Sequence, residues 1–476
     1  MRSRHLIAAV AIGLTTACPS PAPLSTPPST PPSTPSTSPT RFTSSVSAQN
    51  VEASEATHGP RWRHNDVEGA LAAARATDRV VFIDAWAPWC HTCLSMQREV
   101  LEQPALGALA ARVEFVAVDT DKVENAAFLA RFPVSLWPTF FVLDPARPEG
   151  PPLAVHPGSG TLDEMLALVQ AALAARAGDD ASRRLDEALA AVHAASTPAG
   201  NDSAAIGSAW EKALALAPVG HPRRGELLRR AAWARVKGDA STCVRFIEAH
   251  RAEVTTGGAP GDLEAALLSC ASRLAGDAQR TARDGARTRL RSLVQTPPVG
   301  AAVDDRADTM ATLAELEETL GDHAAAVALH VQRLRLLEED AQKATTEKGA
   351  QVHDYARLHS LLFLGRGDEA VALLQARAKA LPDDYEPPAR LASALFRLKR
   401  HDEAKAAATT AIGLAYGPRR LRYLLLLADI EVARGDVGAA RAALQRIIDD
   451  GAALPPAMQL PGVVDDARAR LQKLPG

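Results

Sequence analysis

The chain has 476 residues, which is long enough for two or three domains with well-buried cores. Apolar residues make up 47% of it but aromatic residues only 4%, a mixture that favours many closely packed helices over a large β-sandwich. The formal net charge is −3 and no dense run of Lys and Arg follows the first few residues, so the composition argues against a nucleic-acid partner.

Residues 1–18 have the composition of a targeting signal. A basic start is followed by the apolar residues 6–14, which are too few to span a bilayer, and by small residues that end at Cys18. This segment resembles the bacterial lipoprotein signal, whose cysteine is lipidated and becomes the first residue of the mature chain. The resemblance implies a signal peptide, lipidation of Cys18 and a place in the bacterial cell envelope, facing the periplasm. Ordinary secretion and a retained membrane anchor are the alternatives.

The segment 19–58 begins with a long run of Pro, Ser and Thr that contains almost no large apolar side chain. Such a sequence cannot bury a core, so we expect a disordered linker. In polyproline II conformation about thirty residues reach roughly 90 Å, enough to hold a folded body away from a membrane. A disordered tail without that role is the alternative.

From residue 59 the pattern changes to alternating helices and strands. Val80 begins an apolar, β-branched and aromatic run that is typical of a central strand. Asp66 is a plausible N-cap, Pro104 a helix terminator, and Thr161 with Glu164 a capping-box pattern. This order of elements predicts a small α/β sheet covered by helices. The predicted helices are 66–79, 93–103, 122–132 and one from 161, and the predicted strands are 80–86, 113–119 and 137–144.

Cys90 and Cys93, in the stretch WAPWCHTC, follow the first predicted strand. A c-type haem anchor would need His after the second cysteine, where this chain has Leu94. A structural zinc site would need a second pair of ligands, which the nearby sequence does not offer. A structural disulfide across so short a ring would constrain the unfolded chain little. A dithiol at a helix N-terminus gains more, because the helix dipole favours a thiolate, and the pattern therefore favours redox chemistry.

Three motifs together resemble the thioredoxin superfamily: WAPWCHTC itself, Asp84 six positions before Cys90, and the sequence Trp-Pro-Thr about 45 residues later. Within that superfamily, residues 80–106 are similar to the C-terminal thioredoxin-like domain of bacterial thiol:disulfide interchange proteins. The resemblance implies an α/β thioredoxin-like domain over residues 59–176. The dipeptide between the cysteines is His-Thr rather than the Gly-Pro of thioredoxin, which leaves the direction of electron flow open.

The resemblance also implies roles for individual residues. Cys90 is expected to be an exposed nucleophile that attacks a substrate disulfide, and Cys93 the buried cysteine that resolves the mixed disulfide, so that the oxidised form carries a Cys90–Cys93 disulfide. Asp84 is expected to lie buried under the pair and to shuttle the proton of Cys93; an acid that points to solvent is the alternative. Pro138 matches the family's cis-proline, which faces the dithiol and presents backbone groups to the substrate.

The neighbours of the dithiol are expected to tune it. Trp89 and Trp137 flank the site, whereas Trp86 is more simply explained by core packing. His91, if protonated, would help to hold the Cys90 thiolate and make the pair more oxidising, and an exposed loop residue is the alternative. No cofactor and no metal are expected.

Residues 180–476 carry no catalytic motif, and they repeat. Ala370, Ala404 and Ala440 occupy equivalent places at intervals of 34 and 36 residues, although the spacing breaks up between 245 and 320. This period, with a small residue where two helices touch, resembles tetratricopeptide repeats and predicts an all-α solenoid. Such arrays have a groove that binds peptides or partner proteins; a stabilising scaffold without a partner is the alternative.

Cys243 and Cys270 fall within this helical region. Buried thiols are the first interpretation of these residues, and a structural disulfide is the alternative that an oxidising compartment would permit. We expect neither of them to be catalytic.

Two functions compete for the whole chain. The first is an envelope thiol–disulfide oxidoreductase, more a reductase than an oxidase, whose helical repeats recruit protein disulfide substrates or a redox partner protein. The second is a non-catalytic interaction scaffold with a degenerate thioredoxin-like module. The presence of Cys90, Cys93, Asp84 and Pro138 favours the first. Contact with a membrane is expected only through the lipid anchor.

Overall fold

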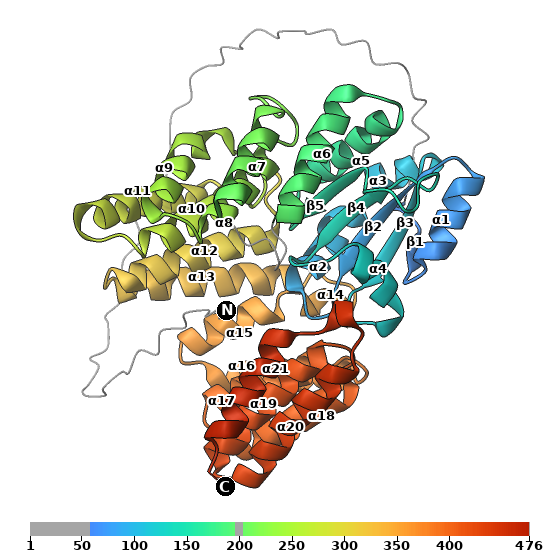
Figure 1. Cartoon of the computed structure of the whole chain (residues 1–476). Helices are drawn as coiled ribbons and strands as arrows, with labels where there is room; N and C mark the ends of the chain where they lie inside the picture. Colours follow the sequence, from blue (N-terminus) through green and yellow to red (C-terminus); the bar gives the residue numbers. More distant parts are fainter. Residues whose placement is uncertain (1–57, 196–202, 476) are drawn as a thin grey trace. The chain divides into compact units, whose positions relative to one another are not determined.

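The structure, a computed structural model, describes residues 58–195 and 203–475 (Figure 1). The predictions for residues 1–57, which include the signal peptide, most of the linker and the lipidation of Cys18, lie outside the described residues. Within the described ranges no helix is both long enough and apolar enough to cross a membrane.

A mixed five-stranded sheet forms the centre of the thioredoxin-like domain (Figure 1). Its order is β1-β3-β2-β4-β5, with β1, β3 and β2 parallel, β4 antiparallel to β2, and β5 antiparallel to β4. The middle strand β2 has the apolar run VVFIDAW, and it is buried on both faces as a central strand should be. The strands are β1 Trp62–His64, β2 Val80–Trp86, β3 Val113–Asp119, β4 Thr139–Leu143 and β5 Ala154–Pro157.

Helices cover both faces of this sheet. Phe82 of β2 packs in one apolar core with Leu168 of α5, whereas its neighbour Ile83 packs in the opposite core with Leu71 of α1. The helices of this domain are α1 Val67–Ala76, α2 His91–Met96, α3 Pro104–Gly107, α4 Ala126–Arg131 and α5 Leu162–Arg176.

The predicted strands and helices of this domain are confirmed. Asp66 caps α1 by accepting a hydrogen bond from the Gly69 amide, and Thr161 and Glu164 form the capping box of α5. The strands β1 and β5 were not predicted, because three and four residues are too short to show an alternating pattern.

The helix that begins after Cys90 changes from α-helical to π-helical geometry after Met96. α2 runs from His91 to Met96, continues as a π-helical turn over Gln97–Leu101, and ends before Pro104, which opens α3. Wider turns of this kind are often found at functional sites.

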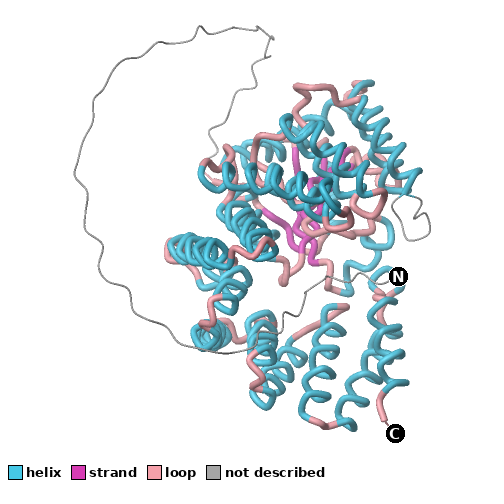
Figure 2. The backbone as a smooth tube through the Cα atoms, turned by 90° about the vertical axis from the view of Figure 1, so that its left-hand side faces the viewer, coloured by secondary structure: helices cyan, strands magenta, loops and turns pink. Residues whose placement is uncertain are grey.

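The rest of the described chain is a succession of helices, and most of them pack against the next (Figure 2). The first helices are α6 Asp180–Ala195, α7 Ser203–Ala215, α8 Arg224–Arg235, α9 Ala240–His250, α10 Ala259–Ala271, α11 Gly276–Gln295, α12 Val303–Thr319 and α13 His323–Ala341. The later ones are α14 Glu347–Gln351, α15 Asp354–Phe363, α16 Gly367–Ala380, α17 Glu386–Arg397, α18 His401–Leu414, α19 Arg419–Arg434, α20 Val437–Ala453 and α21 Pro461–Lys473.

The predicted repeat positions lie where these helices touch. Ala370, Ala404 and Ala440 are fully buried in α16, α18 and α20. The period breaks up earlier in the chain because α11 has 20 residues, whereas α16 and α18 have 14 each.

Cys243 of α9 and Cys270 of α10 form a disulfide inside the core of the helical array. Of the two alternatives left open by the sequence, the structure therefore contains the disulfide rather than two free thiols.

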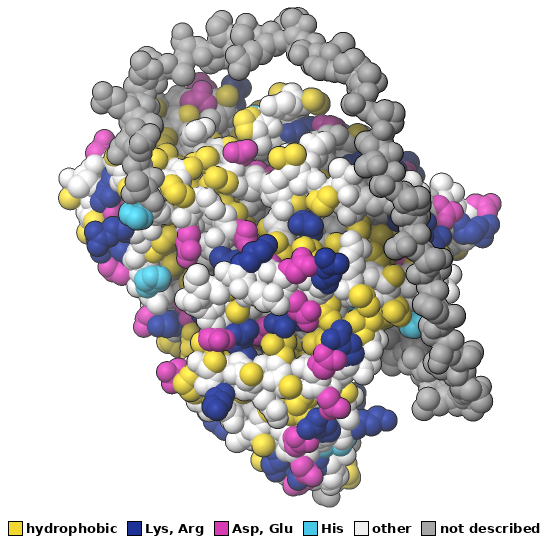
Figure 3. All heavy atoms as spheres, turned by 180° about the vertical axis from the view of Figure 1, so that it is seen from behind, with side chains coloured by type: hydrophobic (Ala, Val, Ile, Leu, Met, Phe, Trp, Pro, Cys, Tyr) yellow, Lys and Arg dark blue, Asp and Glu magenta, His cyan; other side chains and the backbone are white. Residues whose placement is uncertain are grey.

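On the face of the molecule drawn in Figure 3, basic and acidic side chains are interspersed, and no extended area carries a single sign. This surface agrees with the nearly balanced composition of the chain.

Candidate active site

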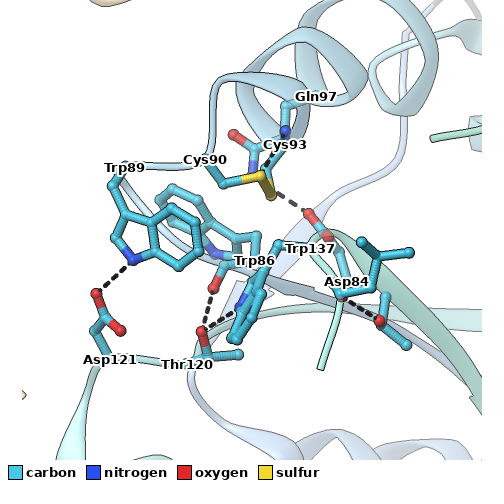
Figure 4. The surroundings of a disulfide bond; sticks show 11 residues. Asp84, Trp86, Trp89, Cys90, Cys93, Gln97, Thr120, Asp121 and Trp137 are labelled. Atoms are coloured by element: carbon cyan, nitrogen blue, oxygen red, sulfur yellow. Dashed lines mark hydrogen bonds between the residues drawn. A yellow bond between two sulfur atoms is a disulfide. The ribbon is translucent and has the colours of Figure 1, made fainter. Parts of the chain in front are cut away.

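The two cysteines lie at the junction between β2 and α2 (Figure 4). Cys90 is the N-cap of α2, and its sulfur accepts a hydrogen bond of 3.0 Å from the amide of Cys93. The two residues form a disulfide, with their Cα atoms 5.2 Å apart. A sulfur that receives amide hydrogen bonds at a helix N-terminus is stabilised as a thiolate when the disulfide is reduced.

Cys90 is less accessible than the resemblance implied. Its exposed fraction is 5%, and that of Cys93 is 0%. The reason is that the helical array covers the residues on both sides of Cys90: the His91 ring stacks on Tyr355 of α15, with ring centroids 5.0 Å apart, and the guanidinium of Arg419 lies 4.6 Å from the centre of the Trp89 ring.

Asp84 lies in the interior of the domain, in the middle of β2 and 1% exposed. Its Oδ2 accepts a hydrogen bond of 3.3 Å from Nε2 of Gln97, and its Oδ1 has no hydrogen-bond partner. Burial raises the pKa of Asp84 to about 7, and the Gln97 hydrogen bond offsets only part of that rise. The predicted buried position is therefore found, and the solvent-exposed alternative is not.

Gln97 was not singled out in the sequence. The signal was nevertheless present, because Gln97 comes four residues after Cys93 and residues at this spacing share one face of a helix. Figure 4 shows Gln97 and Asp84 next to the disulfide and joined by this hydrogen bond.

Pro138 begins the turn into β4 after a cis peptide bond with Trp137. The indole Nε1 of Trp137 donates a hydrogen bond of 2.7 Å to Oγ1 of Thr120, which in turn donates to the carbonyl oxygen of Trp86. The rings of Trp137 and Trp89 meet edge to face at 5.1 Å. Together with Trp86, for which core packing was expected, they pack against the buried group of Ala87, Cys90 and Cys93 (Figure 4).

His91 differs from both of its sequence alternatives. It is half-buried rather than exposed, and burial lowers the pKa of its ring below 6.5. The carboxylate of Asp308 counteracts that shift, whereas the cations of Arg390 and Arg333 add to it. A neutral ring at neutral pH offers little charge to a thiolate at Cys90.

Three side chains hold Trp89 in place, and together with Trp89 we call them the docking cluster. The Trp89 indole donates a hydrogen bond of 2.9 Å to Oδ2 of Asp121, and the Tyr385 hydroxyl donates to the same oxygen at 3.2 Å. Arg419 completes the cluster over the Trp89 ring. Burial and the nearby Asp119 carboxylate raise the pKa of Asp121 to about 7.

The sequence could have predicted that Asp121 lies near Trp89, but not that Tyr385 and Arg419 do. Asp121 follows β3, which runs parallel to β2, so both strands bring their carboxyl ends to the same edge of the sheet. Tyr385 and Arg419 come from the helical array, and no local pattern connects them with Trp89.

Among the described residues, no three His, Cys, Asp or Glu side chains are grouped so that they could hold a metal ion.

Residues 61–145 match a protein-family model described as thioredoxin-like. Among solved structures, the chain is similar to a tetratricopeptide repeat protein from Parabacteroides merdae ATCC 43184, with 12% identity and a TM-score of 0.36, over 61% of this chain and 98% of that chain. It is also similar to BtubC (BKLC) from P. vanneervenii, with 16% identity and a TM-score of 0.29, over 48% of this chain and 92% of that one.

A third similar structure is the assembly chaperone of RpL4 (Acl4), with 15% identity and a TM-score of 0.27, over 61% of this chain and 97% of that one. TM-scores of this size carry no argument about function. No curated protein matches the chain. The family match, the strand order and the succession of helices identify a thioredoxin-like domain followed by an array of packed helices.

Proposed function

We propose that the protein is a thiol–disulfide oxidoreductase that uses the Cys90–Cys93 pair. The observation that carries the proposal is the placement of this pair at the N-terminus of α2, next to the buried carboxyl of Asp84 and the loop of Pro138 (Figure 4). A helix N-terminus favours the thiolate, and a carboxyl with a pKa of about 7 is suited to accept or return a proton at neutral pH.

In the reducing direction, the Cys90 thiolate attacks one sulfur of a substrate disulfide. The substrate S–S bond breaks, a mixed disulfide forms, and the other substrate sulfur leaves as a thiolate that takes up a proton. Cys93 then gives its proton to Asp84 and attacks the sulfur of Cys90, which releases the second substrate sulfur. The substrate has gained two electrons, and the Cys90–Cys93 disulfide has formed. A dithiol donor returns the pair to its reduced form.

Reduction is the direction that we favour. A protonated His91 would stabilise the Cys90 thiolate and make the pair more oxidising, but burial lowers the pKa of His91 and leaves the ring neutral near pH 7. The similarity of residues 80–106 to thiol:disulfide interchange proteins supports the same direction.

We place the protein in the bacterial cell envelope, anchored by a lipid on Cys18 and facing the periplasm. Support comes from the lipoprotein-like sequence of residues 1–18 and from the second disulfide, Cys243–Cys270, because buried disulfides of this kind persist in oxidising compartments. Labelled fatty acid should be incorporated into the wild-type protein and not into Cys18→Ser. A mature protein that starts elsewhere with a free amine would exclude the anchor.

The enzymatic proposal is tested with the full-length protein, dithiothreitol as electron donor, and insulin or hydroxyethyl disulfide as substrate. Cys90→Ser should abolish reduction because no nucleophile remains. Cys93→Ser should trap a mixed disulfide with the substrate, because attack still occurs and resolution does not. The proposal fails if the wild-type protein neither reduces these disulfides nor oxidises a reduced peptide, and if its thiols titrate near the ordinary cysteine value of about 8.5.

A non-catalytic scaffold is the second candidate, and the low exposure of Cys90 favours it. A dithiol that is 5% exposed on one cysteine and 0% on the other offers little surface to a folded substrate. In that case the pair would not exchange with hydroxyethyl disulfide either, which separates the two functions in the same assay.

A further inference from the structure

A cavity of about 530 Å³ lies between the thioredoxin-like domain and the helical array. One wall contains Thr92, which stands between the two cysteines, and the segment Ser135–Trp137, which leads into Pro138. The other wall comes from α8, α10 and α12. The cavity therefore borders Thr92 and Trp137, which are neighbours of the redox pair, on one side and the helical array on the other.

The other flanks of the pair are covered. Tyr355 lies on the His91 ring, and Tyr385 and Arg419 hold Trp89. The flank formed by Thr92 and Trp137 faces the cavity instead.

The rim of the cavity is apolar and exposed. Leu136, from the loop before Pro138, is 49% exposed, and Trp233 of α8 is 44% exposed. Large apolar side chains with this exposure, one on each wall, offer contact area to an apolar group that enters between them. A cavity of this size holds a short stretch of extended chain and is too small for a folded surface.

Six ionisable residues line the cavity, four aspartates and two arginines: Asp262, Asp304, Asp305, Asp308, Arg229 and Arg230.

Both guanidinium groups are already engaged. Arg229 donates to Asp262 and to the carbonyl of Ser159, and Arg230 donates to Glu226, which does not line the cavity. The Asp308 side chain is 53% exposed and pairs with Arg333 at 3.2 Å through one oxygen. Burial favours the protonated form of the other three aspartates, and it raises the pKa of Asp305 to about 7. Asp308 is thus the exposed carboxylate of this lining, and its second oxygen is the acceptor that a cationic side chain would bind.

We propose, on the basis of the oxidoreductase function above, that this cavity is the substrate site and that its substrate is an extended polypeptide segment with a basic residue next to its cysteine. The cysteine reaches Cys90 past Thr92 and Trp137, an apolar neighbour packs on Trp233, and the Lys or Arg side chain binds Asp308. Exchange follows the steps given above, so the peptide disulfide is reduced by two electrons as the Cys90–Cys93 disulfide forms.

The test uses the reduced full-length protein and short cysteine peptides in mixed disulfide with thionitrobenzoate. The Cys90 thiolate attacks the peptide sulfur and expels coloured thionitrobenzoate; Cys93 then attacks Cys90 and releases the peptide thiol. We expect kcat/KM to be about five- to tenfold higher for a peptide with Lys beside the cysteine than for the same peptide with Glu, the ratio given by one charge pair near a surface.

Variants of cavity residues test whether the cavity causes the preference for the Lys peptide over the Glu peptide. Asp308→Asn should reduce the Lys-over-Glu ratio to about twofold or less, and Trp233→Ala should raise KM for peptides with a large apolar neighbour. Asp465→Asn, an exposed carboxylate on α21 that lies outside the cavity, is the matched control and should leave both unchanged. The mixed disulfide of thionitrobenzoate with 2-hydroxyethanethiol reports whether each variant keeps an intact dithiol site.

The outcomes separate the two proposals. Equal rates for the Lys and Glu peptides, or an unchanged ratio in Asp308→Asn, overturn the substrate site while reaction with the small mixed disulfide still supports the oxidoreductase. A native, folded protein disulfide that reacts as fast as the Lys peptide shows a folded substrate and also overturns it. Absence of reaction with the small compound as well overturns the oxidoreductase proposal itself.

Discussion

At the scale of single residues, Asp84 has an environment that determines its chemistry. Its carboxyl group is in the middle of a buried strand, receives one hydrogen bond from Gln97 and has an oxygen without a partner. A charged carboxylate in such a place is costly, so burial favours the protonated form and raises the pKa to about 7. A pKa of about 7 suits the proton-transfer role proposed for this carboxyl group.

Asp84→Asn should stabilise the oxidised protein at pH 8. The folded-state pKa is raised above the unfolded value, so the wild-type carboxyl favours the fold below about pH 4, and this contribution is lost as the pH rises through about 7. Asn carries no charge that must be buried. The free energy of unfolding should therefore exceed that of the wild type by on the order of 3–4 kcal/mol at pH 8 and by near zero at pH 4. Urea unfolding at the two pH values measures it. A gain independent of pH would contradict the assigned pKa.

Gln97→Leu should move the pH dependence of the resolving step upward. The Gln97 hydrogen bond lowers the pKa of Asp84, so its removal raises the pH above which the carboxylate is available as a base. The experiment uses rapid mixing to measure how fast a preformed mixed disulfide at Cys90 decays at pH values from 6 to 9. The midpoint of the rate against pH is the quantity compared between the variants. In an Asp84→Asn background the same substitution should change nothing; a shift there would show that Gln97 acts by another route.

At the scale of elements, the turn between α18 and α19 determines how closely the helical array approaches the redox site. Gly417 in this turn has φ +55°, and a Cβ atom on it would lie 1.9 Å from the carbonyl oxygen of Asp121. The adjacent Tyr416 hydroxyl donates a hydrogen bond of 2.5 Å to Asp119. The absence of a side chain at one residue therefore permits the contact between two elements that are far apart in the sequence.

Gly417→Ala should loosen this contact and expose Cys90. The added methyl group meets backbone atoms that cannot rotate away. The left-handed conformation of an alanine costs about 1–2 kcal/mol in addition. We expect a lower Tm and, after reduction, faster alkylation of Cys90 than in the wild type. Gly413→Ala on α18 is the control: nothing lies within 4 Å of its added Cβ, and Ala favours a helix. Equal alkylation rates in the two variants would contradict the covering role of this turn.

The helices and strands, and the residues next to the cysteines, were predictable from the sequence. The contacts by which the helical array covers the redox site were not. The run VVFIDAW, the cap at Asp66 and the box at Thr161 are local signals, and each produced the expected element. The small residues at Ala370 and Ala404 report helix contacts because their spacing repeats. The contact of Tyr355 with His91 leaves no such trace, since a single exposed aromatic on a helix looks the same whether or not another domain lies on it.

At the scale of the whole molecule, the described residues from 58 onward belong to one compact unit rather than to two separate bodies. Met458, near the C-terminus, packs in the same core as Ile83 of the central strand. Ser95 of α2 donates a hydrogen bond of 2.6 Å to Asp304 of α12. We therefore expect the dithiol chemistry of the full chain to depend on the helical array as well as on the thioredoxin-like domain.

Removal of the second disulfide should weaken the fold and leave the redox chemistry in place. Cys243 and Cys270 are 27 positions apart, and a cross-link across a loop of this length stabilises by about 3 kcal/mol in the chain-entropy model. The double variant Cys243→Ala/Cys270→Ala should lose about that much free energy of unfolding in urea, while its rate with hydroxyethyl disulfide stays within twofold or so of the wild type. A large loss of rate in a still-folded variant would reveal a redox role for this pair.

The burial of that second disulfide has a consequence for a population of such molecules. Exchange requires a thiolate to reach a sulfur atom directly, and neither Cys243 nor Cys270 has any exposed surface. Under the proposed reductase function, one copy therefore cannot reduce the Cys243–Cys270 disulfide of a folded neighbour. Only a copy that has unfolded exposes this bond to attack.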